Sequence, residues 1–269
     1  MTKEKMNYKL RIFIAKKFLL VVVFIFVAEI TAFSQQDTTK NKSWHENVIG
    51  VSGFYSLQSP FGELADRYGL NSDVGIHPFF MLRNNFTFGL EFNYMFGNQL
   101  RGDAAHILDQ LMTSNGQVLN TNGEYANIVL SERGFFAGGK IGKIFYLKKG
   151  KKIAMITNLG IGLLQHKIRI EVEGNNVPGL YGDYAKGYDR LTNGLAINQF
   201  LGVGYMPLYS PINFFIGVEV NEAWTKNRRD FNFDTMERDN HLRHDYLFGI
   251  KAGWIITIYK QDIKQYYYF

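Results

Sequence analysis

Long stretches of alternating apolar and polar residues constrain the fold of this chain more than any other feature. Residues 86–96 carry a large apolar side chain at every even position, while the odd positions include Glu91 and Asn93. A period of two is typical of a β-strand, whose successive side chains point to opposite faces. Strands of soluble proteins average about five or six residues, whereas membrane-spanning strands need about nine to eleven. The length of this alternation favours a strand that crosses a membrane.

The same alternation divides the chain into eight candidate strands. They span residues 48–57, 73–83, 86–97, 133–147, 152–170, 194–209, 212–224 and 245–259. The links between them are alternately long and short, and the short links are 84–85, 148–151 and 210–211. Outer-membrane barrels have an even number of strands, short periplasmic turns and long extracellular loops. The sequence therefore predicts an all-β chain folded as an eight-stranded antiparallel transmembrane β-barrel, with ten strands as the alternative.

The amino terminus has the composition of a secretory signal. Six basic residues precede the apolar run 18–28, which is followed by the small residues Ala32 and Ser34. A basic segment, an apolar core and small residues at a cleavage site form the pattern of a signal peptide. The apolar run is shorter than the roughly 20 residues of a spanning helix, which disfavours an uncleaved anchor. We expect a signal peptide over residues 1–34, a barrel over residues 35–269 and a periplasmic N-terminus.

The net charge of +6 does not indicate a nucleic-acid partner. Six of the 30 basic and two of the 24 acidic residues precede position 35, which leaves 24 basic against 22 acidic residues in the remainder. A protein that binds nucleic acid needs a larger basic excess, because it neutralises many phosphates. The chain has no cysteine, which excludes thiolate metal sites, disulfide scaffolds and a lipid on an N-terminal cysteine. We expect no cofactor and no metal.

The inward-facing positions of the predicted strands are small or polar. Small barrels fill their interior with side chains, and a charge held away from water must be paired. Glu91 and Lys140 lie at similar depth on adjoining predicted strands, and so do Glu219 and Lys251. We therefore predict two ion pairs in the lumen. The alternative, a path for ions or protons, is disfavoured because eight strands enclose little more than their own side chains.

The signal, the eight segments, the loop asymmetry and the terminal sequence Tyr-Tyr-Tyr-Phe together resemble the small outer-membrane barrels of the OmpA/OmpX type, as found in Bacteroidota. The resemblance covers nearly all of the chain after the signal and implies a Gram-negative cell envelope. In that family a terminal Phe closes the last strand and is read by the barrel-assembly machinery, which implies this role for Phe269. Polar residues interrupt the last strand after position 259, so residues 260–269 are either its end or a periplasmic tail.

Two of the predicted loops have features of their own. The longest, residues 98–132, contains apolar residues at helical spacing over 104–112 and an Asn-Gly pair that predicts a hairpin over 117–130. This insert either packs as a lid on its own barrel or docks a partner. The loop at 179–190 alternates tyrosines with charges and is a candidate site for a sugar or a protein.

Evidence for catalysis in the sequence is weak. The candidate bases or metal ligands at the extracellular rim are His166, His241, His244, Asp183, Asp189, Asp239 and Asp245. Neither a Gly-x-Ser-x-Gly nor a His-Glu-x-x-His motif accompanies them. A basic group, Lys226, Arg228 and Arg229, follows Trp224, and we interpret it as a contact for lipopolysaccharide phosphates or as a solvated surface. We therefore expect no catalytic residue.

The function that we expect is non-enzymatic, a structural or partner-binding role through long extracellular loops. The expected surroundings are outer-membrane lipid and lipopolysaccharide, with the barrel-assembly machinery acting during biogenesis. One alternative is an accessory subunit of an envelope secretion or assembly machine, such as the type 9 secretion barrels that the chain resembles in build, with an envelope protein as its partner. The others are a lipid-modifying enzyme of the outer membrane and a narrow porin.

Overall fold

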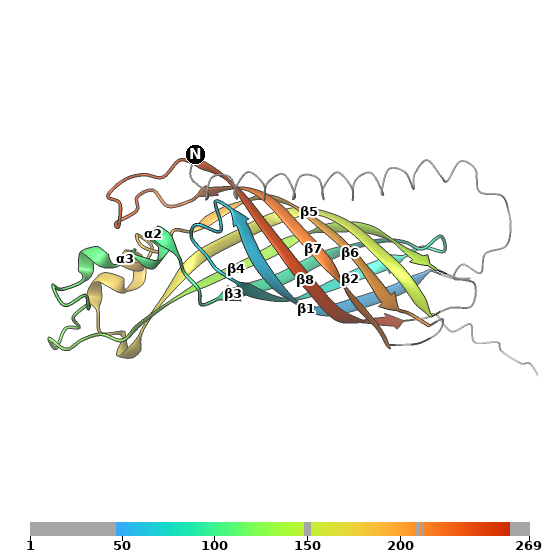
Figure 1. Ribbon diagram of the computed structural model, residues 1–269, viewed down its shortest axis with the longest axis horizontal. Helices are drawn as coiled ribbons and strands as arrows, with labels where there is room; N and C mark the ends of the chain where they lie inside the picture. The colour runs from blue at the N-terminus through green and yellow to red at the C-terminus, as the bar shows by residue number, and fades with distance from the viewer. Residues whose placement is uncertain (1–46, 148–151, 208–209, 211, 259–269) are drawn as a thin grey trace, which may run out of the picture.

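The computed structural model describes residues 47–147, 152–207, 210 and 212–258. The predicted signal peptide, residues 260–269 and the predicted assembly signal Phe269 lie outside this part of the chain. Eight antiparallel strands form one closed sheet, in which each strand pairs with its neighbours in sequence and the last pairs with the first (Figure 1). The predicted eight-stranded barrel is thereby confirmed, and the ten-stranded alternative is wrong.

The eight strands are β1 (Val48–Gly62), β2 (Asn71–Met81), β3 (Phe86–Gly97), β4 (Ile128–Tyr146), β5 (Ile153–Val172), β6 (Thr192–Tyr205), β7 (Ile212–Asn227) and β8 (Leu242–Ile258). Five of the eight strands, β1, β4, β5, β7 and β8, are longer than the sequence pattern indicated. Most of the additional residues lie at the end of the barrel where the long links are found. There the strands continue to pair, for example Gln58 with Asn71 and Gly62 with Asp245. Their outward positions are no longer uniformly apolar, so alternation does not mark them.

Large apolar side chains cover the outer surface of the barrel. Along β3, Phe88, Leu90 and Phe92 are exposed on this surface, whereas Glu91 and Asn93 are buried inside. Each of the other strands also exposes large apolar residues. An apolar surface of this extent around a closed sheet is the surface of a transmembrane barrel. No helix in the described part of the chain is long and apolar enough to cross a membrane.

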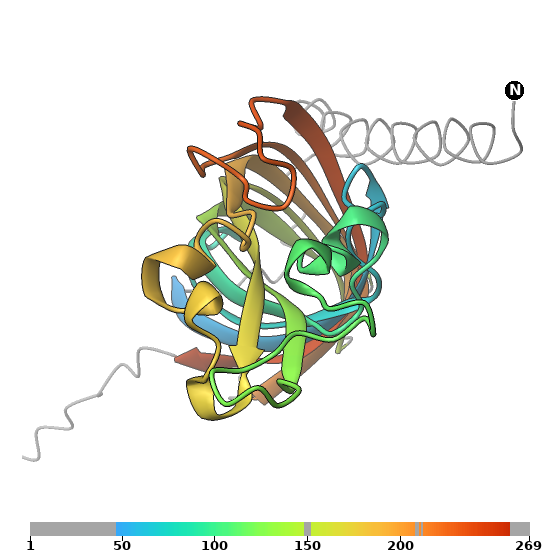
Figure 2. The same ribbon diagram turned by 90° about the vertical axis from the view of Figure 1, so that its left-hand side faces the viewer.

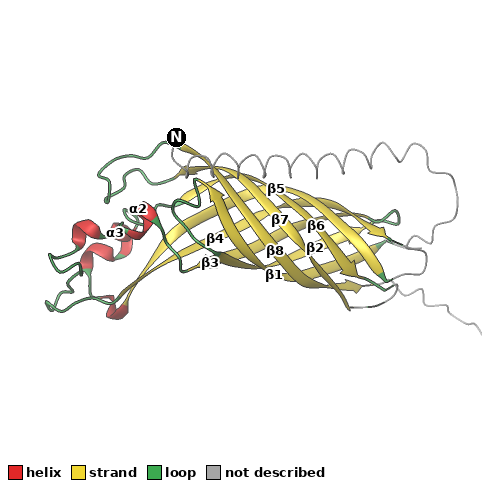
Figure 3. Ribbon diagram, in the orientation of Figure 1, coloured by secondary structure: helices red, strands yellow, loops and turns green. Residues whose placement is uncertain are grey.

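The links alternate in length as predicted and separate the two ends of the barrel (Figure 3). We name residues 63–70, 98–127, 173–191 and 228–241 loops 1 to 4, and the end that carries them the loop end. The opposite, turn end carries the short links. In the first of these, Asn85 has a φ of 64°, a left-handed conformation that asparagine tolerates better than most residues. It lets the Leu82 amide donate to the Phe86 carbonyl at 2.8 Å.

The loops carry only short helical turns. These are α2 (Gly102–Ala105) and η2 (Asp109–Leu111) in loop 2, and η3 (Glu173–Asn175), η4 (Pro178–Leu180) and α3 (Gly182–Ala185) in loop 3. The single amphipathic helix predicted over residues 104–112 is therefore wrong, because α2 ends at Ala105 and the chain turns before η2 begins. The hairpin predicted over 117–130 is present in shortened form. It is held by a bridge between Leu119 and Tyr125, and Ile128 already belongs to β4.

The interior towards the turn end is filled by aromatic and aliphatic side chains. Phe54, Phe79, Phe200 and Phe215 lie in one buried cluster there. The rings of Phe200 and Phe215 meet edge to face at 5.6 Å between centroids. Glycines make room for these rings, since a Cβ atom on Gly202 would collide with Phe200. The lumen is thus a packed core at this depth.

Close backbone approach between β4 and β5 supplies a test of this packing. Gly138 and Gly162 are paired across the two strands, and a Cβ on Gly162 would collide with the backbone of Ala137 and Gly138. We predict that Gly162→Val lowers the free energy of unfolding by about 1–3 kcal/mol, the usual effect of overpacking. Urea titration of the heat-modifiable band on gels measures it. The control is Gly139→Val, where a Cβ meets nothing within 4 Å; equal stability of the two variants would refute the explanation.

Candidate functional site

Four charged side chains meet inside the barrel at mid-depth. Lys140 of β4 contacts Glu91 of β3, and Lys251 of β8 contacts Glu219 of β7. Both predicted pairs are therefore in contact in the structure. Two further contacts cross between them, from Lys251 Nζ to Glu91 Oε1 at 3.1 Å and from Lys140 Nζ to Glu219 Oε1 at 3.6 Å. The four groups form one closed network of alternating charge, which we name the lumen network.

Neutral groups complete the coordination of the lumen network. Asn198 Nδ2 donates to Glu219 Oε1 at 2.7 Å, and the Lys251 ammonium lies 3.8 Å from the centroid of the Phe54 ring. The four charged side chains are no more than 3% exposed. Charges so far from water are tolerated only when each has an opposite partner and hydrogen bonds. A cavity of about 30 Å³, lined in part by Glu91, Lys140 and Lys251, adjoins the network.

Apolar residues close the lumen network on both sides along the barrel axis. Phe136 lies four residues from Lys140 towards the loop end, and Ile144 lies four residues from it towards the turn end. Both side chains are buried. Leu247 and Ile255 hold the same positions relative to Lys251. Residues four apart on a strand point to the same side, so one apolar layer lies above the charges and another below. The lumen is therefore filled by side chains at this depth.

A second buried polar group lies nearer the loop end and was not predicted. Asp245 accepts hydrogen bonds from Arg67 of loop 1 at 3.3 Å and from Thr225 at 2.5 Å, and it lies 3.3 Å from His166 Nε2. The ring of Tyr68 meets that of His166 edge to face. Arg67 and Tyr68 belong to a loop without sequence periodicity, so only the fold reveals that loop 1 reaches into the barrel.

The rim residues considered for catalysis do not form one site. Asp245 and His166 are buried inside the barrel, whereas His244 is exposed beside the Trp224 ring, and His241 lies 3.4 Å from Glu63. The acidic candidates pair with basic side chains: Asp183 with Lys186, Asp189 with Arg229, and Asp239 with Arg243. Within the described residues, no three His, Cys, Asp or Glu side chains are grouped so as to hold a metal ion.

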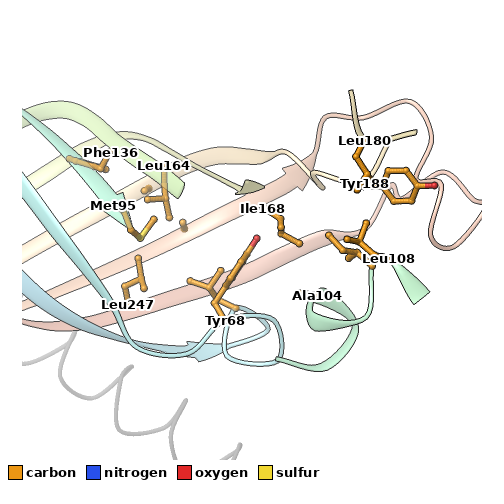
Figure 4. Packing of buried hydrophobic residues seen from close by; sticks show 14 of the residues in the cluster. Tyr68, Met95, Ala104, Leu108, Phe136, Leu164, Ile168, Leu180, Tyr188 and Leu247 are labelled. Carbon is orange, nitrogen blue, oxygen red and sulfur yellow. The ribbon is translucent and has the colours of Figure 1, made fainter. Parts of the chain in front are cut away.

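The loops have a hydrophobic core that continues into the barrel. It combines Leu64 and Tyr68 of loop 1, Ala104, Ile107, Leu108 and Val118 of loop 2, and Val177, Leu180 and Tyr188 of loop 3 with the barrel residues Met95, Phe136, Leu164, Ile168, Ala196, Ala223 and Leu247. Figure 4 shows these side chains packed in a continuous file from the loops into the lumen. Loop 2 is therefore a lid on its own barrel. We name the four loops together the cap (Figure 2).

Backbone hydrogen bonds tie each loop of the cap to another. The Gly69 amide of loop 1 donates to the Gln99 carbonyl of loop 2 at 2.7 Å. Between loops 2 and 3, the Thr121 amide donates to the Asn176 carbonyl at 2.9 Å. Between loops 3 and 4, the Phe233 amide donates to the Gly187 carbonyl, also at 2.9 Å. The loops therefore support one another instead of projecting separately.

Ion pairs strengthen the joint between loops 3 and 4. Arg229 donates through Nε and Nη2 to the two carboxylate oxygens of Asp189, at 2.7 and 2.5 Å, and Arg190 pairs with Asp234. The hydrogen bond to Asp189 raises the pKa of Arg229 above its usual value. Arg228 Nε donates to Asn193 at 2.5 Å. Two of the three cations interpreted as a contact for lipopolysaccharide thus have partners within the protein.

Comparisons with known proteins find barrels but no close relative. No protein-family model matches the chain, and no curated protein matches it. Neisserial surface protein A is 10% identical, with 77% of this chain and 96% of that chain covered and a TM-score of 0.43. The N-terminal β-barrel domain of Pseudomonas aeruginosa OprF is 10% identical, with 78% of this chain and 98% of that chain covered and a TM-score of 0.37. The outer membrane protease OmpT from Escherichia coli is 10% identical, with 82% of this chain and 100% of that chain covered and a TM-score of 0.30.

The lumen network supplies a test of charge balance in the core. We predict that Lys251→Met lowers the free energy of unfolding by about 3–5 kcal/mol, because it leaves two carboxylates with one cation in a buried site. The double variant Glu219→Gln/Lys251→Met restores neutrality and should be the more stable of the two. Both are compared with the wild type by urea unfolding in detergent micelles. An unchanged unfolding curve for Lys251→Met, or a double variant weaker than the single one, would count against the network.

Proposed function

We propose that this chain is a non-enzymatic barrel of a Gram-negative outer membrane, in which the plugged barrel is a scaffold and the cap binds a partner outside the cell. The observation that carries the proposal is the cap itself. Loops 1 to 3 share one core with the barrel, and Phe233 of loop 4 packs against that core. Hydrogen bonds and ion pairs join the four loops to one another. A surface held in one conformation binds with less loss of entropy than separate mobile loops.

The outer face of the cap offers apolar contacts among polar ones. Tyr125 of loop 2 and Phe231 and Met236 of loop 4 are between 41% and 62% exposed. Met236 has a φ of 54°, which is unusual for a residue without special turn chemistry. Exposed aromatic residues and methionine are enriched where proteins bind partners. These features support a binding role for the cap.

Two observations favour binding over catalysis. The buried pair of Asp245 and His166 lies beneath the cap core, where no substrate reaches it. Of the exposed histidines of the rim, His241 lies beside the Glu63 carboxylate and His244 beside the Trp224 indole ring. General acid–base or nucleophilic catalysis needs both groups within hydrogen-bond reach of each other at an accessible position.

The proposed orientation places the turn end in the periplasm and the cap outside. Strand β1 begins and strand β8 ends at the turn end, where Ile49 pairs with Ile258. Short turns on the periplasmic side and long loops on the other are the rule in outer-membrane barrels.

The absence of cysteine allows a direct test of this orientation. We predict that Glu124→Cys, at the exposed tip of loop 2, is labelled by a membrane-impermeant polyethylene glycol maleimide on intact cells. The matched variant Asn84→Cys, in the first turn, should be labelled only after the outer membrane is permeabilised. Gel shifts of the labelled protein give the readout. Labelling of Asn84→Cys alone on intact cells would show the opposite orientation. Recovery of both variants in the soluble fraction would show that the chain does not lie in a membrane.

Binding by the cap is tested by capture from native membranes. After brief amine crosslinking and extraction in mild detergent, we expect the wild type to retain a partner, detected as protein or as carbohydrate. The variant Tyr125→Ser/Phe231→Ser/Met236→Ser should lose it, whereas the control Gln117→Ala/Asn122→Ala, two exposed polar residues of loop 2, should keep it. A partner that persists in the triple variant would assign binding to the barrel wall, as in an accessory subunit. No partner in any preparation would refute the binding role.

A further inference from the structure

An open hollow of about 560 Å³ lies in the cap where loops 2 and 3 meet. It is lined by Thr121 of loop 2 and by Asn176, Pro178, Tyr181, Gly182, Asp183 and Tyr184 of loop 3. Its volume falls within the range of about 300–1,000 Å³ that is usual for sites of small ligands. Three of these residues belong to α3, which lies among the loops at the loop end of the molecule (Figure 1).

The walls of the hollow are held in place from both sides. Thr121 donates its amide hydrogen to the Asn176 carbonyl at 2.9 Å. On either side of Pro178, Val177 and Leu180 are buried in the core of the cap, at 5% and 6% exposure. The hollow is therefore formed before any ligand arrives, which reduces the entropic cost of binding.

Two tyrosines supply flat, accessible surfaces on this site. Tyr181 is 45% and Tyr184 is 65% exposed, and the Tyr184 amide donates to the Tyr181 carbonyl at 3.0 Å, which sets the two residues one turn apart. Neither phenol hydroxyl has a hydrogen-bond partner among the described residues. An exposed tyrosine of this kind offers a ligand both an apolar ring face and a polar hydroxyl. They lack the burial that would explain them as core residues.

Polar groups with free hydrogen-bonding capacity stand between and beside the tyrosines. Asn176 Oδ1 is buried at the edge of the hollow and has no partner in the described residues, a state that native proteins generally avoid. Asp183 uses Oδ1 to accept from Lys186 at 2.5 Å, which leaves its second oxygen to accept elsewhere. Thr121 adds a hydroxyl that can donate or accept. Acceptors and hydroxyls around aromatic faces match a ligand with apolar ring faces and many hydroxyl groups.

We propose that this hollow is a binding site for a neutral glycan, whose pyranose rings stack on Tyr181 and Tyr184 while ring hydroxyls bond to Asp183, Asn176 and Thr121. The charge of the lining argues for a neutral sugar. No Lys or Arg lines the hollow, and the neighbouring Lys186 is paired with Asp183, so a sulfated or phosphorylated ligand lacks its counter-charge. This inference rests on the proposed function and deepens it, because it adds to the cap a site for a ligand of stated chemistry, apart from the surface of Tyr125, Phe231 and Met236.

A printed array of neutral mammalian and bacterial glycans tests the site. The full chain is presented in an amine-oxide detergent, since maltoside and glucoside detergents are themselves sugars. We expect the wild type to bind at least one glycan, and Tyr181→Ala/Tyr184→Ala to bind it at least about tenfold more weakly through loss of both stacking faces. Tyr181→Phe/Tyr184→Phe keeps the rings and should bind within about threefold of the wild type. Heat-modifiability on gels confirms that each variant is folded.

The matched control is Tyr55→Ala, which removes a comparably exposed tyrosine of β1, 51% exposed, outside the hollow. Purified lipopolysaccharide and capsular polysaccharide of the producing cell form a second arm, which distinguishes a self-glycan from one on a foreign surface. Binding to no glycan in either arm, or equal loss of binding in Tyr55→Ala, would overturn the inference. If the capture experiment then still returns a cap-dependent protein, the proposed function stands without the glycan site.

Discussion

Closure of the sheet between β1 and β8 is the constraint on which the rest of the structure depends. In a membrane each backbone amide and carbonyl must find a partner within the protein, and a sheet meets this requirement only when it has no edge. Fourteen consecutive residue pairs, from Ile49 with Ile258 to Gly62 with Asp245, provide the closure. With eight strands the enclosed space is narrow, so the choice of interior side chains follows from the closure.

The narrow interior explains why large rings, glycines and charges occur together in one core. Phe200 occupies the space above Gly202, and Gly138 faces Gly162 where β4 and β5 approach closely. Lys140 and Lys251 lie between apolar layers, where neither can reach water without moving its neighbours. Their charges are balanced by Glu91 and by Glu219 across the lumen. The lumen network is thus balanced, with two acidic and two basic side chains.

The cap extends this core beyond the strands. Ile107 and Leu108 of loop 2 are as fully buried as the barrel residues beneath them, and Arg67 of loop 1 reaches down to Asp245 of β8. Because the same side chains plug the barrel and fasten the loops, the outer face of the cap is held in a defined shape. The hollow beside Tyr181 and Tyr184 is one consequence of that shape.

The sequence by itself determined the number of strands, their order and the two faces of each, because lipid on one side and a packed lumen on the other impose a period of two. It also placed Glu91 beside Lys140 and Glu219 beside Lys251, since neighbouring strands pair in a predictable register. Only the tertiary structure decided that these two pairs join across the lumen, since β3 and β8 are not neighbours. Likewise, the ion pair of Arg67 with Asp245 and the hydrogen bond of Thr121 with Asn176 depend on where the loops lie once the barrel is closed. Contacts of this kind leave no periodic trace in a sequence, because they follow from the curvature of the closed sheet and not from the pattern of any one strand.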